Sequence, residues 1–176
     1  FWQEEYIPSL ALGERWKQVS EKRDFNAIIV SLPGVKESFA QALQHDPAWV
    51  LIHLDEISAV WVRNRESNAA ILHALAWNGQ RLAAYERMIS EQLLVLPDQP
   101  WWRRPREADR LAYALYGLIC LGENARAWPY VWQLHLLYPD YQIVHELLRV
   151  TAPPQAWNRL EPIFARPARW PLAAKQ

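Results

Sequence analysis

Residues 24–63, DFNAIIVSLPGVKESFAQALQHDPAWVLIHLDEISAVWVR, decide the fold because the spacing of their apolar residues changes from one segment to the next. Residues 27–32 form a short apolar run before a proline and a glycine, which is typical of a strand buried on both faces. Apolar residues then recur at helical spacing from Val35 to Leu43. Residues 49–54 and 57–63 are rich in β-branched and aromatic residues, so we expect two further strands.

The last two strands are too close in sequence for anything but an antiparallel hairpin, residues 49–63. A two-residue turn at Asp55-Glu56 would place Leu54 opposite Ile57, although a longer loop stays open because the turn has no glycine. Residues 10–22 have helical spacing, so the predicted order is helix, strand, helix, strand, strand. A right-handed crossover then predicts a small mixed sheet, with the second hairpin strand beside the first strand of the chain.

After Arg65 the pattern is helical to about residue 165. Signals that end helices follow one another in this part, at Asn78-Gly79, Pro97, Gly122 and Pro139. The sequence therefore predicts an α+β fold. It places a small α/β subdomain in residues 1–64, an all-α region of helical hairpins in residues 65–165 and a C-terminal tail in residues 166–176.

Composition limits the classes of partner. Lys plus Arg and Asp plus Glu number 19 each, so there is no global field to attract nucleic acid, and no nucleic-acid partner is expected. The apolar runs are shorter than the ~18 to 20 residues that a membrane-spanning helix needs. The chain begins at Phe1 with no initiating Met, which fits a piece of a longer protein. A lone cysteine, Cys120, excludes an internal disulfide framework.

The first third of the chain resembles the segment that follows the last membrane span in multi-spanning bacterial glycosyltransferases that use lipid-phosphate sugars. The matching positions are Trp16, Phe25 to Val30, Leu43, Pro47, Trp49 to His53, Asp55 and Ala59 to Arg63. The resemblance implies the C-terminal domain of an inner-membrane protein, facing the periplasm or another extracytoplasmic space. Its motifs are structural, so it indicates where this piece sits and not what it does.

The helical part resembles a degenerate pair of tetratricopeptide repeats, in which Leu-Gly ends a first helix and a small residue and a closing proline follow on the second. The matching residues are Leu121-Gly122, Ala127 and Pro139, and then Asn78-Gly79, Ala84 and Pro97. The closing prolines are 139 − 97 = 42 residues apart, against about 34 in the family. The Trp and Tyr of the family's first helix are also missing. The resemblance implies stacked helical hairpins, capped by the α/β part.

The sequence carries few signs of catalytic chemistry. The chain lacks the GxxxxGK[ST], GxGxxG and GxSxG motifs, so nucleotide hydrolysis is not expected. The histidines have neither the spacing nor the companion thiols of a zinc site; they include His53, His73, His135 and His145. Cys120 lies in a helical apolar stripe and is expected to be a buried filler. Asp55 and Glu56 are expected to be solvated turn residues with ordinary pKa values. We therefore predict no catalytic, cofactor-binding or metal-ligating residue, and no cofactor.

The chain has eleven tryptophans, most of which lie where a strand or helix places a core residue. The expected core members are Trp16, Trp49, Trp61, Trp77, Trp128, Trp132 and Trp157. Trp101, Trp102 and Trp170 differ, because they lie among arginines and prolines in predicted loops.

We expect a contact surface at these loop residues. Its members are Trp101, Trp102, Arg103, Arg104 and Arg106, joined by Arg166, Arg169 and Trp170. Indole rings favour the bilayer interface and arginines favour anionic headgroups, so this surface suits a membrane. The alternative that the sequence favours over this contact is that the tryptophans pack between helices and the arginines pair with Glu86, Glu91 or Glu107. In another, the rings form a glycan- or base-stacking platform, which is less favoured because nothing polar and directional accompanies them.

Three functions stay open. The first is a non-enzymatic protein-interaction or scaffolding tail of a multi-spanning bacterial membrane protein, whose partner is another protein or its own membrane region. The second is an accessory, acceptor-side domain of a membrane glycosyltransferase, whose catalytic acids would lie outside this chain. The third is a free-standing soluble adaptor. The coding sequence upstream of Phe1 separates the third from the others.

Overall fold

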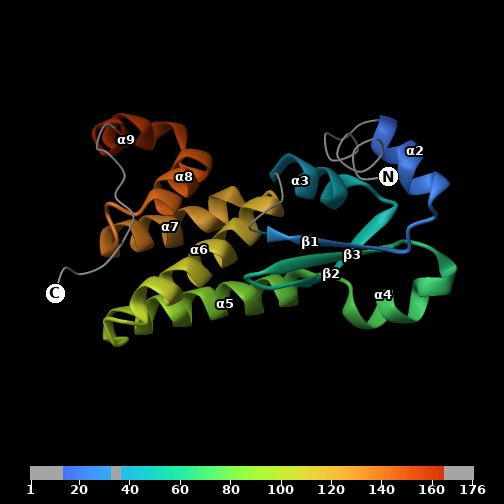
Figure 1. Cartoon of the computed structure of the whole chain (residues 1–176), viewed down its shortest axis with the longest axis horizontal. Helices are drawn as coiled ribbons and strands as arrows, with labels where there is room; N and C mark the ends of the chain where they lie inside the picture. Colours follow the sequence, from blue (N-terminus) through green and yellow to red (C-terminus); the bar gives the residue numbers. More distant parts are fainter. Residues whose placement is uncertain (1–13, 33–36, 165–176) are drawn as a thin grey trace. The chain divides into compact units, whose positions relative to one another are not determined.

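The computed structural model describes residues 14–32 and 37–164 (Figure 1). The chain divides into two compact units, residues 1–78 and 79–176, called here the α/β unit and the helical unit. A small sheet with helices precedes an all-helical region, so the predicted α+β class is confirmed.

The elements of the α/β unit follow the predicted order of helix, strand, helix, strand, strand. They are α2 (Glu14–Lys22), β1 (Ala27–Ser31), α3 (Glu37–His45), β2 (Trp49–Leu54) and β3 (Ser58–Arg63), then the 3-10 turn η3 (Glu66–Asn68) and α4 (Ala69–Leu75). The parts of the predicted helices at residues 10–13 and 35–36 lie outside the described residues.

The sheet has the strand order β1-β3-β2. The second hairpin strand therefore lies beside β1, as predicted. The prediction of a mixed sheet is wrong, because β3 pairs antiparallel with both of its neighbours. Strands β1 and β2 run in the same direction, but β3 separates them, so the crossover through α3 creates no parallel ladder.

The hairpin register also differs from the two-residue turn. Leu54 pairs with Ala59 instead of Ile57, and the register shifts between Leu51 and His53. The loop is longer because Asp55 organises it: its Oδ1 accepts the backbone N–H of Ile57 at 2.8 Å and that of Ser58 at 2.6 Å. Such a side-chain-closed turn needs no glycine.

Asp55 is not the ordinary solvated acid that we predicted. Burial raises its pKa, but the hydrogen bond to His53 Nε2, at 2.9 Å, and the two backbone N–H groups of the loop lower it more. The net pKa lies below the usual value. The role of Asp55 is to hold the turn.

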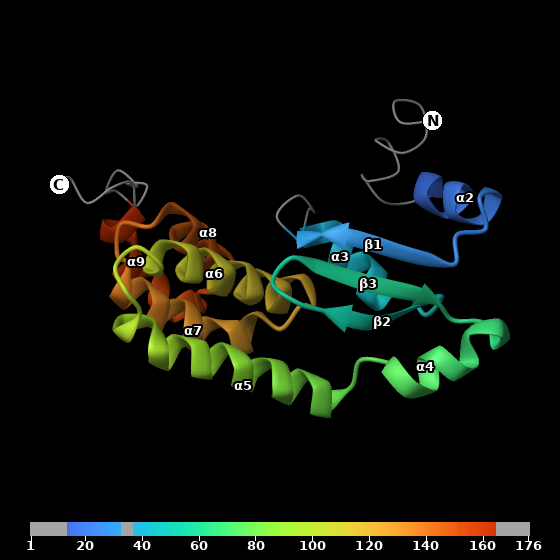
Figure 2. The ribbon, with the colours of Figure 1, turned by 60° about the horizontal axis from the view of Figure 1, so that its bottom comes forward.

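One face of the sheet carries the core of the α/β unit. Trp61 is fully buried there, opposite Ile28 on one side and Leu51 on the other. The Trp16 ring of α2 lies 5.3 Å from Phe39 of α3 and 6.3 Å from Trp49 of β2, measured between centroids. The two helices thus cover the same face, and Figures 1 and 2 show α3 on that side. The predicted burial of Trp16, Trp49 and Trp61 is confirmed.

Strand β1 is not buried on both faces, contrary to the prediction. Ala27, Ile29 and Ser31 are exposed, and the exposed fraction of Ile29 is 74%. Only Ile28 and Val30, on the face that α2 and α3 cover, are partly buried. Because the apolar character of a strand does not reveal whether it lies at an edge, the sequence pattern alone misassigned this one.

The helical unit consists of helices joined by short turns, so helical hairpins are confirmed. Its elements are α5 (Gly79–Val95), η4 (Leu96–Asp98), α6 (Arg104–Cys120), α7 (Asn124–Leu137), α8 (Gln142–Thr151), η5 (Pro154–Ala156) and α9 (Trp157–Phe164). Helix α6 forms the centre, with its apolar side chains almost completely buried. Cys120 is among them, as predicted.

Gly122 ends α6 with a left-handed turn, at a φ of 81°. Its N–H donates to Ile119 O at 2.9 Å, and the N–H of Glu123 donates to Leu118 O at 3.0 Å. These two bonds form a Schellman motif, which satisfies carbonyls that the helix end would leave unpaired. The motif reverses the chain into α7.

Two further differences concern the domain limits and one tryptophan. The predicted boundary lies after residue 64, whereas the α/β unit extends to Asn78. Helix α4 packs on β2, and the N–H of Trp77 donates to Leu51 O at 2.8 Å, which ties this segment to the sheet. Trp157 is 41% exposed, so its predicted place in the core is wrong. The predicted tail, residues 166–176, lies outside the described residues.

Candidate contact surface

The predicted contact surface begins in the connection between η4 and α6. Gln99 is extended before Pro100, as a residue preceding proline prefers. The Pro100 carbonyl then accepts the N–H groups of Arg103 at 2.8 Å and Arg104 at 3.2 Å, which closes a turn. Pro105 lies in the first turn of α6, where its missing N–H leaves no bond unmade. The turn directs the two tryptophans outward.

Trp101 and Trp102 are 69% and 64% exposed. Their rings meet edge to face, with centroids 5.9 Å apart and an interplanar angle of 89°. The alternative in which they pack between helices is therefore wrong. Two large exposed indoles side by side are unusual, since tryptophan is highly buried on average.

The arginines beside them carry charge that no carboxylate of the described residues neutralises. Arg103, Arg104 and Arg106 are exposed, and none of them forms an ion pair within the part of the chain that the structure describes. Arg104 Nε instead donates to Gln99 O at 2.6 Å. Two of the three expected acidic partners are engaged elsewhere: Glu86 with Arg126 at 3.2 Å, and Glu107 with Arg110 at 3.4 Å.

Exposed apolar residues, which the sequence did not single out, lie at the same end of the helical unit. They lie at the ends of α5 and α7: Leu94, Val95, Leu136 and Leu137. Helices α6 and α7 form a hairpin, so the end of α7 returns to the start of α6, and Figures 1 and 2 place it near the α5–α6 connection. We call this set, with Trp101, Trp102 and the three arginines, the tryptophan–arginine surface.

An electrostatic effect supports this proximity. Burial raises the pKa of Tyr138, which follows α7, and the positive charge of Arg104 partly opposes the rise. The start of α6 and the end of α7 are therefore close enough for their charges to interact. Asp98 and Asp140 are the exposed acids of the adjoining turns, so the surface is only moderately cationic. Its predicted further members, Arg166, Arg169 and Trp170, lie outside the described residues.

The helical unit also has a groove of about 400 Å³. Its lining residues are Trp128, Trp132, Pro153, Gln155, Ala156 and Leu160. The rings of Trp128 and Trp132 lie 5.8 Å apart at its wall. Both tryptophans, predicted as core, are half-buried because they face this groove.

The histidines do not assemble a metal site in the described residues, where no group of three or more metal-ligating side chains occurs. The His135 and His145 rings are 5.7 Å apart, and both are buried. His145 Nε2 donates to the Pro139 carbonyl at 2.6 Å, which is a structural use of the ring. His53, on the surface, binds Asp55.

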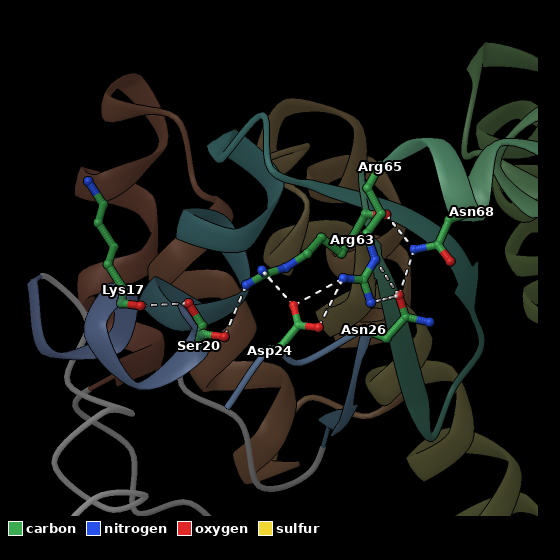
Figure 3. Close-up of polar contacts among 7 residues, drawn as sticks. All are labelled: Lys17, Ser20, Asp24, Asn26, Arg63, Arg65 and Asn68. Carbon is green, nitrogen blue, oxygen red and sulfur yellow. Dashed lines mark hydrogen bonds and ion pairs between the residues drawn. The ribbon is translucent and has the colours of Figure 1, made fainter. Parts of the chain in front are cut away.

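A polar cluster in the α/β unit surrounds Asp24, whose carboxylate lies between two guanidinium groups (Figure 3). Arg63 Nη1 is 3.4 Å and Arg65 Nη1 is 3.0 Å from Asp24 Oδ1. Arg65 also donates twice to Asn26 Oδ1, at 2.7 and 3.1 Å, and Asn68 Nδ2 donates to the same oxygen at 2.7 Å.

The same cluster extends to α2, where Arg63 Nη2 donates to the Ser20 carbonyl at 3.1 Å (Figure 3). It therefore ties the start of β1, the end of β3 and the turn before α4 together. The polar groups bond one another and join elements of the unit, so we assign the cluster to the fold.

In the described ranges, 14–32 and 37–164, none of the helices has the length and apolarity required to cross a lipid bilayer. Comparisons of the chain with protein-family models, curated proteins and solved structures found no match.

Proposed function

We propose that this chain is a non-enzymatic module that rests on the surface of an anionic lipid bilayer through the tryptophan–arginine surface. The observation that carries the proposal is the pair of exposed indoles, Trp101 and Trp102, next to arginines that pair with no carboxylate among the described residues. Indole rings partition to the headgroup region because they are apolar with one polar N–H. Each basic residue near an anionic leaflet adds about 1 kcal/mol of attraction.

The apolar neighbours support the same mode of binding. Leu94 is 74% and Leu136 is 65% exposed, and both lie at the end of the unit that bears the indoles. Monomeric proteins rarely expose large contiguous apolar patches, which mark interaction sites when rimmed by polar groups. Burial of these side chains at the bilayer interface adds the hydrophobic term that three arginines alone do not supply.

The context that the sequence suggests is the tail of a multi-spanning bacterial membrane protein, which would hold the module at a bilayer. The resemblance of residues 16–63 to such tails supports this part of the proposal. The coding sequence upstream of Phe1 tests it: repeated ~20-residue apolar spans are expected, and their absence would favour a free-standing adaptor. A glycosyltransferase parent further predicts that transfer falls when residues 1–176 are deleted from the full protein.

Vesicle co-sedimentation tests the membrane contact. The chain should bind vesicles of phosphatidylcholine and phosphatidylglycerol, bind pure phosphatidylcholine more weakly, and lose the difference at high salt. The double variant Trp101→Ala/Trp102→Ala should weaken binding at least about tenfold, because two interfacial anchors are gone. Trp157→Ala is the matched control, since Trp157 is also an exposed tryptophan of the helical unit. Equal binding by both variants would contradict the proposal.

The groove of Trp128 and Trp132 favours a second candidate, a protein-interaction module. Its volume of about 400 Å³ and its aromatic wall suit an extended apolar or proline-containing peptide. Trp132→Ala should then abolish a protein association that Trp101→Ala/Trp102→Ala leaves intact. Crosslinking in cells that express the two variants distinguishes the candidates: a protein crosslink lost only in Trp132→Ala supports the groove, and identical patterns count against it.

A further inference from the structure

Strand β1 forms one edge of the sheet, and its inner side is fully engaged by β3. The N–H of Arg63 donates to Asn26 O at 2.9 Å, and the N–H of Leu32 donates to Ile57 O at 2.8 Å. These bonds show that the even-numbered residues along β1 face β3.

The residues between them must direct their backbone groups outward, because an antiparallel ladder alternates. Ala27, Ile29 and Ser31 therefore present N–H and C=O groups at the outer edge. No strand lies beyond β1 in the described part of the chain. Only another extended strand matches such a row of alternating donors and acceptors, so the backbone defines the chemistry of the missing neighbour.

The two edges of this sheet are protected unequally. At β2 the register shifts between Leu51 and His53, and the N–H of Trp77 occupies the Leu51 carbonyl. Irregularities and covering segments of this kind prevent edge-to-edge pairing. Strand β1 has a regular register over residues 27–31 and no proline or charged residue. Among the described residues, no further strand pairs with the edge of β1, whereas the edge of β2 is blocked.

The side chains of β1 also favour pairing. Ile29 is 74% exposed on one face. On the other face a groove of about 180 Å³ runs beside the strand. It is lined by Trp16, Phe25 and Phe39 and by residues 27–30 of β1. A strand added at this edge would cover Ile29 and place its own apolar side chains against the aromatic wall.

We propose that β1 pairs antiparallel with β1 of a second copy of this chain, forming a symmetric dimer through a continuous sheet. The outward groups are centred on Ile29, so a two-fold axis places Ile29 opposite itself and Ala27 opposite Ser31. The pairing is self-complementary, and the uncharged strand creates no repulsion across the axis. Head-to-tail pairing of β1 with β2 would instead build open filaments, and the blocked edge of β2 prevents it.

Sedimentation equilibrium of the full chain over a range of concentrations tests the dimer. We expect a weak, reversible dimer, since a short strand buries little area. Ile29→Lys should raise the dissociation constant at least about tenfold, because it places two like charges face to face at the axis. Ile71→Lys is the matched control: Ile71 is also an exposed isoleucine of the α/β unit, at 46%, but lies on α4. A chain that stays monomeric throughout, or equal dimerisation of the two variants, overturns the proposal.

Amide hydrogen exchange of the unaltered chain provides a second readout that does not depend on a variant folding. The amides of Ala27, Ile29 and Ser31 should gain protection as concentration rises, whereas those of Ile28 and Val30, bonded to β3, should be protected at every concentration. A dimer whose outer β1 amides exchange freely would place the interface elsewhere and overturn the proposal. Protection of these amides by a different protein, without self-association of the chain, would also overturn the proposal.

Discussion

The guanidinium carbon of Arg63 lies 5.2 Å from the centroid of the Trp49 ring. The two residues are cross-strand partners on β3 and β2, so the hairpin itself sets this cation–π contact. The same guanidinium reaches Ser20 of α2. Arg63 therefore links the hairpin to the helix that covers it.

Arg63→Ala should lower the free energy of unfolding of the α/β unit by about 1 to 2 kcal/mol, through loss of the cation–π contact and the hydrogen bond to Ser20. The free energy of unfolding of Arg63→Lys should lie between those of the unaltered chain and Arg63→Ala. A lysine ammonium keeps the positive charge but lacks the planar guanidinium. Hydrogen exchange at β3 amides measures opening of this unit alone. Lys17→Ala is the control: Lys17 is an exposed cation on α2 whose side chain forms no ion pair with a described residue, so a change of about 0.5 kcal/mol or less is expected.

Asp55 should make stability fall at acidic pH. Its pKa is lowered in the folded chain, because its hydrogen bonds outweigh the effect of burial. A lowered folded pKa means that the stabilisation is complete above the unfolded value, near 3.8, and is lost as pH falls through the folded value. The difference in free energy of unfolding between the unaltered chain and Asp55→Asn should therefore be constant around pH 5 and shrink below about pH 4. An advantage that grows on acidification would contradict this assignment.

Gly122→Ala should destabilise the helical unit by about 1 kcal/mol, the usual penalty for a side chain in the left-handed region. A Cβ at this position meets nothing within 4 Å, so the backbone conformation is the sole cause. Gly79→Ala is the matched control, because its Cβ also has open space but Gly79 lacks the positive φ. We expect Gly79→Ala to be neutral or slightly stabilising. Equal decreases in the melting temperature of Gly122→Ala and Gly79→Ala would contradict the strained turn.

Tyr85→Phe should destabilise the packing of α5 on α6 by about 1 kcal/mol, since the buried hydroxyl donates to the Ala114 carbonyl at 3.1 Å. Tyr113→Phe is the control on α6, because its hydroxyl makes no hydrogen bond to any residue that the structure describes. Urea titrations measure the free energy of unfolding of both variants. A larger loss for Tyr113→Phe would show that ring packing, and not the hydroxyl, matters at Tyr85.

The elements of this fold were predictable because each has a strong local signal. Hydrophobic spacing marked the strands and helices, and Gly122 and Pro97 ended helices where expected. The edge position of β1 was not predictable, since an apolar run does not reveal how many faces its neighbours cover. The predicted hairpin register was wrong because the side chain of Asp55, and not a glycine, closes the loop.

The contact surface was predictable only in part. Tryptophan and arginine next to proline marked the turn at residues 100–105, and their exposure follows from it. The exposure of Leu94 and Leu136 was not predictable from the sequence. Helical spacing alone does not show which side of a helix its neighbours leave uncovered. Trp157 was misassigned for the same reason.

Asp24 adopts an unusual backbone conformation, with a φ of 44°, and its carboxylate forms ion pairs with two arginines. These two demands narrow the mutational tolerance of the position. Glycine would relax the backbone but remove the acid, and glutamate would keep the acid but fit the conformation poorly. Asparagine satisfies the conformation and keeps an acceptor, so among random substitutions at residue 24 it should be the one that selection for folding retains most readily.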